Sequence, residues 1–352
     1  MIQGFPEVSK YKVMVQCCTF NQSQYIEDTL KGFAMQQTNF SFVCCIFDDA
    51  STDGEPEVLK RWIENHCNPE NVKVYNHPLT VILMAPDKDN SNCIYAIHLQ
   101  KVNTWGKPVK VEMMAHWEKQ CEYIALCEGD DYWIDPLKLQ KQVDFLNANP
   151  EYSFCHTGFH VFEQSKNEFI DNSDIIKRNT MPYINKLDIM EDILDGNKYR
   201  IQTMTAVVRL SEYYKAIEKL KPYEGLFLMG DTQLWLSLLS FGNVFFMPDI
   251  TAVYRINEGS ACHSKSIQSR IRFALSCAEM RVVMADLFEL NFDAKKKYQS
   301  QYQKKLNLYL AYNANYENFV PIKYNNVFEY LRFQFLKLPI MRAILRNLYH
   351  NI

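Results

Sequence analysis

The residues best suited to chemistry form an acidic cluster, Glu128-Gly129-Asp130-Asp131, that directly follows an apolar run over residues 123–127. Carboxylates at the end of a buried strand lie at the carboxyl edge of a sheet, where open α/β sheets bind their ligands. Their hard oxygens favour Mg²⁺ or Mn²⁺ over Zn²⁺, and such ions bind one or two carboxylates together with substrate phosphates. The cluster therefore predicts a divalent metal site for a phosphorylated substrate. The alternative is an acidic surface turn.

Two further acids stand at the boundaries of predicted elements. Asp49 follows the apolar run over residues 42–47, and Asp231 follows Gly230 at the start of a predicted helix. A carboxylate at a helix start can cap the helix by accepting backbone N–H groups. If it faces a cleft instead, it can act as a general base. Both interpretations of Asp231 stay open at this point.

The elements that must position these acids alternate between strand and helix over the first 150 residues. Apolar runs at residues 12–18, 42–47 and 123–127 predict buried strands. Apolar residues at helical spacing follow each run, and Asp135-Pro136 is typical of a helix start. This alternation predicts an α/β fold with a mostly parallel sheet and helices on both faces.

The rest of the chain gives weaker signals. The predicted elements are strands at 72–75, 81–84, 153–162, 202–208, 244–247 and 251–254, a loop or insertion at 86–108, helices at 113–117 and 231–239, and helices from about residue 267 onward. We therefore expect a main domain over residues 1–262 and a helical C-terminal region over residues 263–352. Within the main domain we expect two halves, at about 10–150 and at about 151–262.

The composition and the absence of several motifs argue against several classes of function. The 38 Lys and Arg residues are balanced by 41 Asp and Glu residues, so no broad basic surface for nucleic acid is expected. The motifs GxxxxGKS/T, GxGxxG, GxSxG and HExxH do not occur in the sequence. P-loop phosphoryl transfer and hydride transfer are therefore disfavoured.

The cysteines and the ends of the chain bear on location. Eleven cysteines without a CxxC pair indicate reduced thiols and predict a cytoplasmic protein. The first residues lack the pattern of a signal peptide, and no apolar run is long enough for a predicted transmembrane helix. The tail over residues 328–352 is rich in apolar residues and carries four basic residues against a single acid. It is predicted either to pack on the core or a second subunit, or to lie peripherally on the inner face of an anionic membrane.

Five segments of the chain carry a recognisable pattern: 15–22 (VQCCTFNQ), 47–54 (FDDASTDG), 123–146 (YIALCEGDDYWIDPLKLQKQVDFL), Gly230-Asp231 and Val253-Tyr254-Arg255. Together they resemble the family 2 glycosyltransferases, inverting enzymes with a GT-A fold, and in particular the bacterial type that carries EGDDYW. They occur in the same order as in that family, and the resemblance covers about residues 10–262. It implies that the main domain has a donor half at about 10–150 and an acceptor half at about 151–262.

The resemblance implies a reaction. Such an enzyme transfers a sugar, as a hexosyltransferase does, from a nucleotide diphosphate sugar to an acceptor hydroxyl, with Mn²⁺ or Mg²⁺ as cofactor. The metal neutralises the charge that develops on the leaving nucleotide. The acceptor would be a glycan or a lipid-linked molecule in the synthesis of surface polysaccharide or glycoconjugate.

The resemblance also implies roles for individual residues. Asp130 would bind the metal at the donor diphosphate, and Glu128, at the first acid of the family's DxD motif, would touch the ribose or a metal-bound water. Asp231 would take the proton from the attacking hydroxyl. The remaining donor-binding residues would be Thr19, Asn21 and Asp49 around the nucleobase, Gly129 at a close approach to the ligand, and Asp131 orienting the site from behind.

Several residues keep two interpretations. Trp133 is either a core aromatic or part of the acceptor pocket, and Arg255 either caps the diphosphate or pairs with an acid. Asn257 stands where the family often has a histidine. Thr203 and Thr205, on a predicted strand, are candidates for the acceptor side.

Two other functions compete with this one. A nucleotidyltransferase also places acids and a metal at a sheet edge, and it would release pyrophosphate rather than nucleoside diphosphate. A non-catalytic protein that binds sugar nucleotides is the second alternative, and the acidic cluster together with Asp231 argues against it.

Overall fold

The computed structural model describes residues 4–7, 10–180, 185–195, 201–257 and 266–313. The chain divides into two compact units, which are described separately below. The first unit comprises Met1–Pro182, Lys198–Lys219 and Ser237–Arg255, and the second comprises Tyr183–Asn197, Leu220–Leu236 and Ile256–Ile352.

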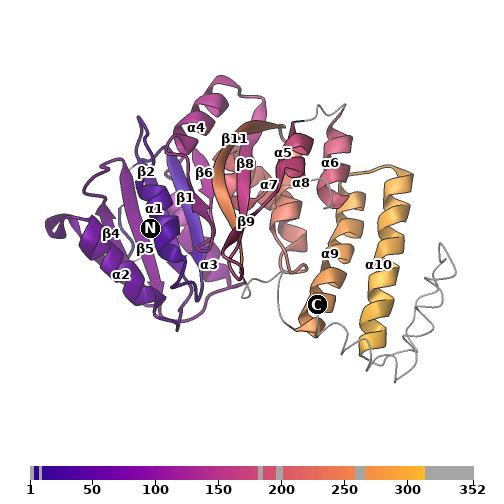
Figure 1. Cartoon of the computed structure of the whole chain (residues 1–352), viewed down its shortest axis with the longest axis horizontal. Helices are drawn as coiled ribbons and strands as arrows, with labels where there is room; N and C mark the ends of the chain where they lie inside the picture. The colour runs from indigo at the N-terminus through magenta and orange to yellow at the C-terminus, as the bar shows by residue number, and fades with distance from the viewer. Residues whose placement is uncertain (1–3, 8–9, 181–184, 196–200, 258–265, 314–352) are drawn as a thin grey trace. The chain divides into compact units, whose positions relative to one another are not determined.

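One eleven-stranded sheet forms the centre of the first unit (Figure 1). Its strand order is β3-β4-β5-β2-β1-β6-β10-β8-β11-β7, with β9 paired to β8. The strands are β1 (Val13–Thr19), β2 (Phe42–Asp48), β3 (Lys73–His77), β4 (Thr80–Pro86), β5 (Cys93–Gln100), β6 (Tyr123–Leu126), β7 (Tyr132–Trp133), β8 (Tyr152–Glu163), β9 (Glu168–Ile170), β10 (Val207–Arg209) and β11 (Asn243–Ile256).

The four strands β5, β2, β1 and β6 are parallel, so their carboxyl ends meet at one edge of the sheet. Antiparallel strands extend the sheet on both sides of this centre. All seven residues of β2 are buried, as expected for a strand covered on both faces. The predicted α/β fold with a parallel sheet is confirmed.

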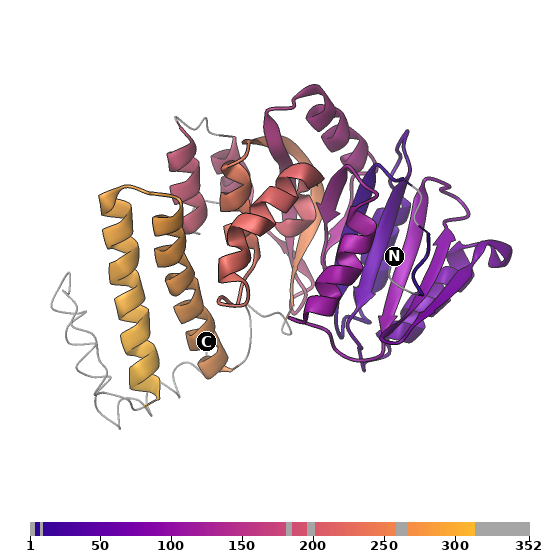
Figure 2. The same cartoon turned by 180° about the vertical axis from the view of Figure 1, so that it is seen from behind.

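Helices cover both faces of the parallel strands. Figure 1 shows α1 and α2 on one face, and Figure 2 shows α3 on the opposite face. Met113 and Trp117 of α3 pack into a buried cluster with Met14, Val43 and Phe47 of the sheet. The helices of this unit are α1 (Ile26–Ala34), α2 (Glu55–His66), α3 (Pro108–Glu118), α4 (Lys138–Ala148), α5 (Ser173–Asn179) and α7 (Leu210–Leu220), with short 3-10 helices η1 (Pro69–Asn71) and η2 (Thr203–Thr205).

The prediction of a loop or insertion over residues 86–108 is wrong, because it contains the central strand β5. This strand pairs with β2 on one side and β4 on the other. Its polar residues interrupt the apolar pattern by which a buried strand is predicted. These residues form hydrogen bonds inside the protein: His98 accepts the indole N–H of Trp117 at 2.8 Å, and Tyr95 donates to Asp87 at 2.9 Å. Burial lowers the pKa of His98 to about 3, so the ring is neutral.

Two other strand predictions change in extent. The strand predicted at 202–208 is reduced to β10, because Thr203–Thr205 form the 3-10 helix η2. The two strands predicted at 244–247 and 251–254 are one continuous strand, β11.

The second unit is helical. It contains α6 (Lys186–Asp195), η3 (Lys221–Tyr223), α9 (Ile267–Leu287) and α10 (Phe292–Tyr312), and α8 (Asp231–Leu239) begins in it. Arg281 of α9 donates to the carbonyl of Leu194 in α6 at 2.6 Å, and Lys297 of α10 pairs with Asp195. The predicted helical C-terminal region is confirmed for these helices. Residues 314–352, and with them the basic tail, lie outside the described residues.

None of the helices in the described part of the chain combines the length and the apolar character that crossing a membrane requires.

Candidate active site

The acidic cluster forms the turn between β6 and β7, at the carboxyl end of the parallel strands. Glu128 and Asp130 are half-buried. Asp131 is only 3% exposed, and its carboxylate accepts the backbone N–H of Arg255 at 2.8 Å. Burial, and then the charge of Asp130, raise the pKa of Asp131 well above its ordinary value. The turn thus holds two acids that can meet a ligand and one that belongs to the supporting structure.

Gly129 is fixed by the end of β1. Its N–H donates to the carbonyl of Cys18 at 3.1 Å. A Cβ atom at this position would lie 2.4 Å from the hydroxyl oxygen of Thr19 and 2.5 Å from the side-chain oxygen of Gln22. The sequence suggested that glycine here lets backbone approach a ligand. The close approach that the structure contains is to the protein itself.

Helix α1 supports the turn from one side. The hydroxyl of Thr29 lies 2.9 Å from the carbonyl oxygen of Gly129 and 2.6 Å from that of Asp131. One helical turn later, a Cβ at Gly32 would lie 2.8 Å from the backbone nitrogen of Trp133, so only glycine lets α1 pack this closely on β7. Sequence reasoning missed both residues. The only signal in the sequence was that these two small residues stand next to the apolar residues of α1.

Arg255 on β11 supports the turn from the other side. Its guanidinium donates to the backbone carbonyl of Asp130 at 2.9 Å, to Gln164 at 2.6 Å and to Asp28 at 2.9 Å. The guanidinium also lies over the rings of Tyr25, Tyr132 and Phe162. Of its two predicted interpretations, this geometry suits pairing with an acid, because every guanidinium nitrogen has a partner in the protein.

Thr19 is the last residue of β1, and Asn21 lies in the loop that follows; both contact residues at or just before the start of α2. The hydroxyl of Thr19 contacts the carboxyl of Glu55, which also accepts the N–H of Gln22 and the hydroxyl of Ser51, both at 2.9 Å. Asn21 has a positive φ of 56° and accepts the N–H of Thr52 through its side chain at 2.8 Å.

Glu55 was not predicted as a site residue from the sequence. It is fully buried in the structure. Burial raises its pKa above the ordinary value, against the lowering effect of its hydrogen bonds to Thr19, Gln22 and Ser51. A glutamate at the first turn of a predicted helix was the only signal.

Asp49 follows β2 at the same edge of the sheet. Its carboxylate is covered by the segment that joins β5 to α3 and by the start of α3. One oxygen accepts the N–H and hydroxyl of Thr104 at 2.6 and 2.8 Å, and the other lies 3.3 Å from the ammonium of Lys110 in α3. The backbone carbonyl of Asp49 accepts the side chain of Asn103 at 3.2 Å. The residue is 2% exposed, so a ligand would meet this segment before it met the carboxylate.

The donor set at the turn fits a hard divalent cation. Mg²⁺ and Mn²⁺ need only one or two protein carboxylates, because substrate phosphates and water complete their ligands. Glu128 and Asp130 provide such oxygens at the sheet edge. Within the described ranges, no group of three or more His, Cys, Asp or Glu side chains could hold a metal ion.

Asp231 is exposed at the first position of α8 and belongs to the second unit. Its carboxylate accepts the N–H of Thr232, the next residue, at 2.8 Å, whereas a capping side chain accepts from a residue two or three positions further on. Its role as a base stays a prediction.

The acceptor-side candidates differ in exposure. Trp133 is 1% exposed, donates its indole N–H to the carbonyl of Met204 at 2.8 Å and packs edge-on against Phe33, which suits its interpretation as a core aromatic. Thr205 is fully buried, whereas Thr203 is half-buried.

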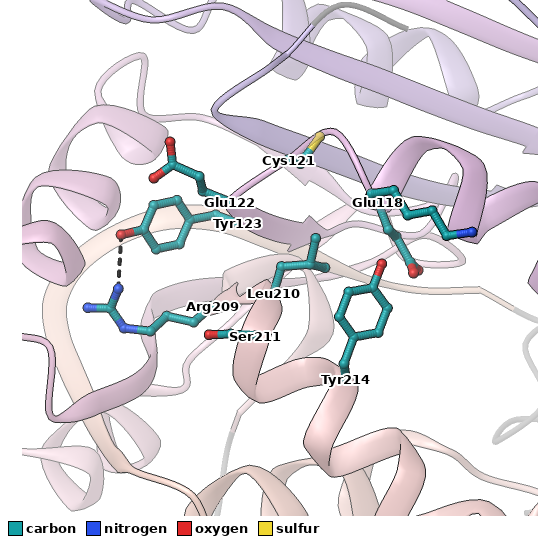
Figure 3. A pocket seen from close by; sticks show the side chains of 9 residues that line it. Glu118, Cys121, Glu122, Tyr123, Arg209, Leu210, Ser211 and Tyr214 are labelled. Atoms are coloured by element: carbon teal, nitrogen blue, oxygen red, sulfur yellow. Dashed lines mark hydrogen bonds between the residues drawn. The ribbon is translucent and has the colours of Figure 1, made fainter.

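A separate hollow opens at the other end of β6, away from the acidic turn (Figure 3). Arg209 lies at its border and donates to the hydroxyl of Tyr123 at 3.1 Å and to the carbonyl of Asn149 at 3.1 Å. On the opposite border, the hydroxyl of Tyr214 points toward the carboxyl of Glu118. These contacts join β10 to β6 and α7 to α3.

Comparison with known proteins agrees with the motifs. Residues 15–80 match the family model described as glycosyl transferase family 2. This segment contains most of β1 and all of α1, β2 and α2, and therefore Thr19, Asn21 and Asp49. The predicted family is thus supported for this segment. The match ends before the acidic turn, so it does not test the EGDDYW subgroup.

Two relatives illustrate the range of similarity. An uncharacterized protein of Mycobacterium tuberculosis is 29% identical over 248 residues, which are 70% of this chain and 59% of that protein. EpsE of Bacillus subtilis, which has a provisional glycosyltransferase name, is 21% identical over 281 residues, or 78% of this chain and 85% of EpsE. The chain thus spans 59% of the length of the mycobacterial relative.

Solved structures show more distant likenesses. The mannosyltransferase PcManGT from Pyrobaculum calidifontis, in complex with GDP-Man and Mn²⁺, is 13% identical with a TM-score of 0.49, and the match covers 97% of this chain and 87% of that chain. Residues 1–349 of S. aureus TarS, in complex with UDP-GlcNAc, are 15% identical with a TM-score of 0.48, covering 96% and 86%. At these values the activity of this chain must be argued from its own residues.

Proposed function

We propose that this protein is a metal-dependent, inverting glycosyltransferase that moves a sugar from a nucleotide diphosphate sugar to an acceptor hydroxyl. The observation that carries the proposal is the acidic turn at the carboxyl edge of the parallel strands, where Glu128 and Asp130 are half-buried and Asp131 is buried behind them. The family match over residues 15–80 supports the same conclusion.

The donor diphosphate would lie against the acidic turn. Asp130, with Glu128 beside it, would hold Mn²⁺ or Mg²⁺, which supplies positive charge to the leaving diphosphate. The turn is held by Thr29 of α1 and Arg255 of β11, so its two half-buried carboxylates do not have to be ordered when the donor binds. Gly129 and Asp131 would act through this supporting structure.

The nucleobase would lie toward the end of β2. Thr19, Asn21 and Asp49 all stand at the ends of β1 and β2, whose last residues are register partners. Asp49 would act mainly by holding Thr104 and Lys110 at the border of the base-binding region.

The acceptor hydroxyl would attack the anomeric carbon directly, so the configuration inverts and no enzyme nucleophile is needed. Asp231 is our candidate for the general base, on the basis of the Gly230-Asp231 motif and its exposed carboxylate. Thr203, which is half-buried, remains a candidate on the acceptor side, and surface polysaccharide or glycoconjugate remains the expected class of product.

Asp231→Asn tests the assignment of the base. This variant should bind a nucleotide diphosphate sugar as the wild type does and lower kcat by roughly 100-fold or more, the usual scale for a lost general base. Isothermal titration and initial rates measure the two quantities. A collapse of donor affinity with an unchanged kcat would make Asp231 a binding or capping residue.

Product analysis separates the competing functions. A glycosyltransferase releases nucleoside diphosphate, whereas a nucleotidyltransferase releases pyrophosphate. A protein that only binds sugar nucleotides would release neither, and it would leave the donor intact on prolonged incubation.

A further inference from the structure

Trp105 differs from every other tryptophan of the chain. All five tryptophans lie in the described ranges, and four of them are at most 5% exposed. Trp105 is 73% exposed. A single exposed apolar side chain is common on protein surfaces and needs no explanation by itself. What sets Trp105 apart is where its backbone is anchored.

The backbone of Trp105 is fixed in a tight turn. The N–H of Lys107 donates to the carbonyl of Thr104 at 2.9 Å, which makes Trp105 the second residue of a four-residue turn. Gly106, the third residue, has a φ of +70°, which glycine adopts readily and which a type II turn requires there. The N–H of Trp105 itself donates to the side chain of Asn103 at 3.1 Å.

This turn is attached to the end of β2. Thr104 donates twice to the carboxylate of Asp49, and Asn103 donates to its carbonyl. The ammonium of Lys110 lies 3.3 Å from the same carboxylate and 5.1 Å from the centre of the Trp105 ring. An ammonium whose charge Asp49 balances therefore stands over the indole, while most of the side chain stays open to solvent.

The turn that carries Trp105 lies at a distance from the acidic turn that suits the ribose and base of a nucleotide. Asp49 follows β2 and the acidic turn follows β6, with only β1 between these strands. Neighbouring strands are about 4.8 Å apart, so the two sites are separated by about 10 Å, a length that a ribose and its base can span. A diphosphate held at the acidic turn would thus direct its base toward the Trp105 turn.

We propose that Trp105 is the stacking surface for the nucleobase of the donor. The inference rests on the proposed function, since it takes the diphosphate to bind at the acidic turn. Stacking suits an exposed, pre-positioned indole because every base offers a flat face, and it contributes affinity without demanding one particular base. Selection among bases would then depend on polar groups around the ring, such as Lys110, whose ammonium lies 5.1 Å from the ring centre.

Binding of nucleoside diphosphates to the wild-type protein tests the inference first. UDP, GDP, ADP, CDP and dTDP are each titrated with Mn²⁺ and followed by thermal shift and by tryptophan fluorescence. A nucleotide that raises Tm should also change the fluorescence and protect it from acrylamide, because Trp105 is the one tryptophan that acrylamide reaches easily. If no nucleotide raises Tm, both the proposed function and this inference fail.

Variants then separate the inference from the proposed function. Trp105→Ala should bind the same nucleotide roughly 10-fold or more weakly, whereas Trp105→Phe should keep most of the affinity. Pyrophosphate with Mn²⁺, which has no base, should bind Trp105→Ala and wild type equally. Phe292→Ala removes another aromatic side chain, 77% exposed and in the second unit, and should bind the nucleotide as wild type does.

Two outcomes would overturn the inference while leaving the proposed function in place. One is a nucleotide that raises Tm without changing the fluorescence of Trp105. The other is unchanged nucleotide affinity in Trp105→Ala. The fluorescence result comes from the wild-type protein, so it decides the matter even if Trp105→Ala does not fold.

Discussion

Burial separates acids that are neighbours in the sequence. Asp130 is half-buried, while Asp131 is 3% exposed and bonded to the backbone of β11. The sequence identified the cluster, because three acids after an apolar run are unusual enough to see. The sequence could not assign their environments, because these depend on Thr29, 102 residues before Asp131, and on Arg255, 125 residues after Asp130.

Gly129 gives a prediction at the scale of one residue. Gly129→Ala should lower the free energy of unfolding by about 1–3 kcal/mol, because the new methyl group would lie 2.4 Å from the Thr19 hydroxyl. It should also lower activity, since the turn must shift to relieve the contact. Urea unfolding measures the first effect.

Gly230→Ala is the matched control, because no atom lies within 4 Å of a Cβ at that position. Its stability should stay close to that of wild type. Equal stability of Gly129→Ala and Gly230→Ala would show that the turn does not depend on the contact with Thr19.

At the scale of elements, the strands and helices with strong periodicity could be predicted from the sequence. β2 and α8 lie where their patterns placed them, since one is a continuous apolar run and the other a short, mostly apolar segment that begins with an acid. β5 could not be predicted, because its His98 and Tyr95 are satisfied in a buried strand only by Trp117 of α3 and by Asp87 in the connection from β4.

The contact between α3 and α7 predicts a dependence of stability on pH. Glu118, at the end of α3, is 5% exposed, and burial raises its pKa to about 7 from an ordinary value of 4.5. The folded protein therefore favours the neutral carboxyl. The stability that this group contributes is complete below about pH 4.5 and is lost as the pH rises through about 7.

Glu118→Gln should remove that part of the pH dependence. The wild type should lose at most about 3 kcal/mol more than the variant between pH 4.5 and pH 8, as measured by urea unfolding across this range. Glu122→Gln, at an exposed side chain of the same hollow, should follow the wild-type profile. Superimposable profiles for wild type and Glu118→Gln would contradict the prediction.

At the scale of the whole molecule, the chain combines a sheet-based unit and a helical unit. The residues with the strongest family signal, 15–80, and the acidic turn all belong to the first of these. Asp231 belongs to the second, and no pattern in the sequence marked that division. The helices after residue 267 could be predicted from their composition, whereas their assignment to one unit with α6 depends on contacts such as Arg281 to Leu194.

The basic tail, outside the described residues, gives a prediction for the whole protein. If residues 328–352 lie on an anionic membrane, the full chain should sediment with vesicles that contain phosphatidylserine, and a truncation after Asn326 should not. Each basic residue contributes about 1 kcal/mol at most, so 0.5 M salt should release the protein. Equal, negligible binding by both proteins would leave packing or dimerisation as the role of the tail.

The central claim is that the acidic turn binds a metal and a nucleotide diphosphate sugar for transfer. The most direct measurement is the release of nucleoside diphosphate from a panel of nucleotide sugars by wild type and Asp130→Ala, each with Mn²⁺ and with EDTA. We predict release by the wild type with Mn²⁺ only, and none by Asp130→Ala, whose Tm should stay close to that of wild type because the side chain is half-buried. Full release in EDTA, or by Asp130→Ala, would contradict the account.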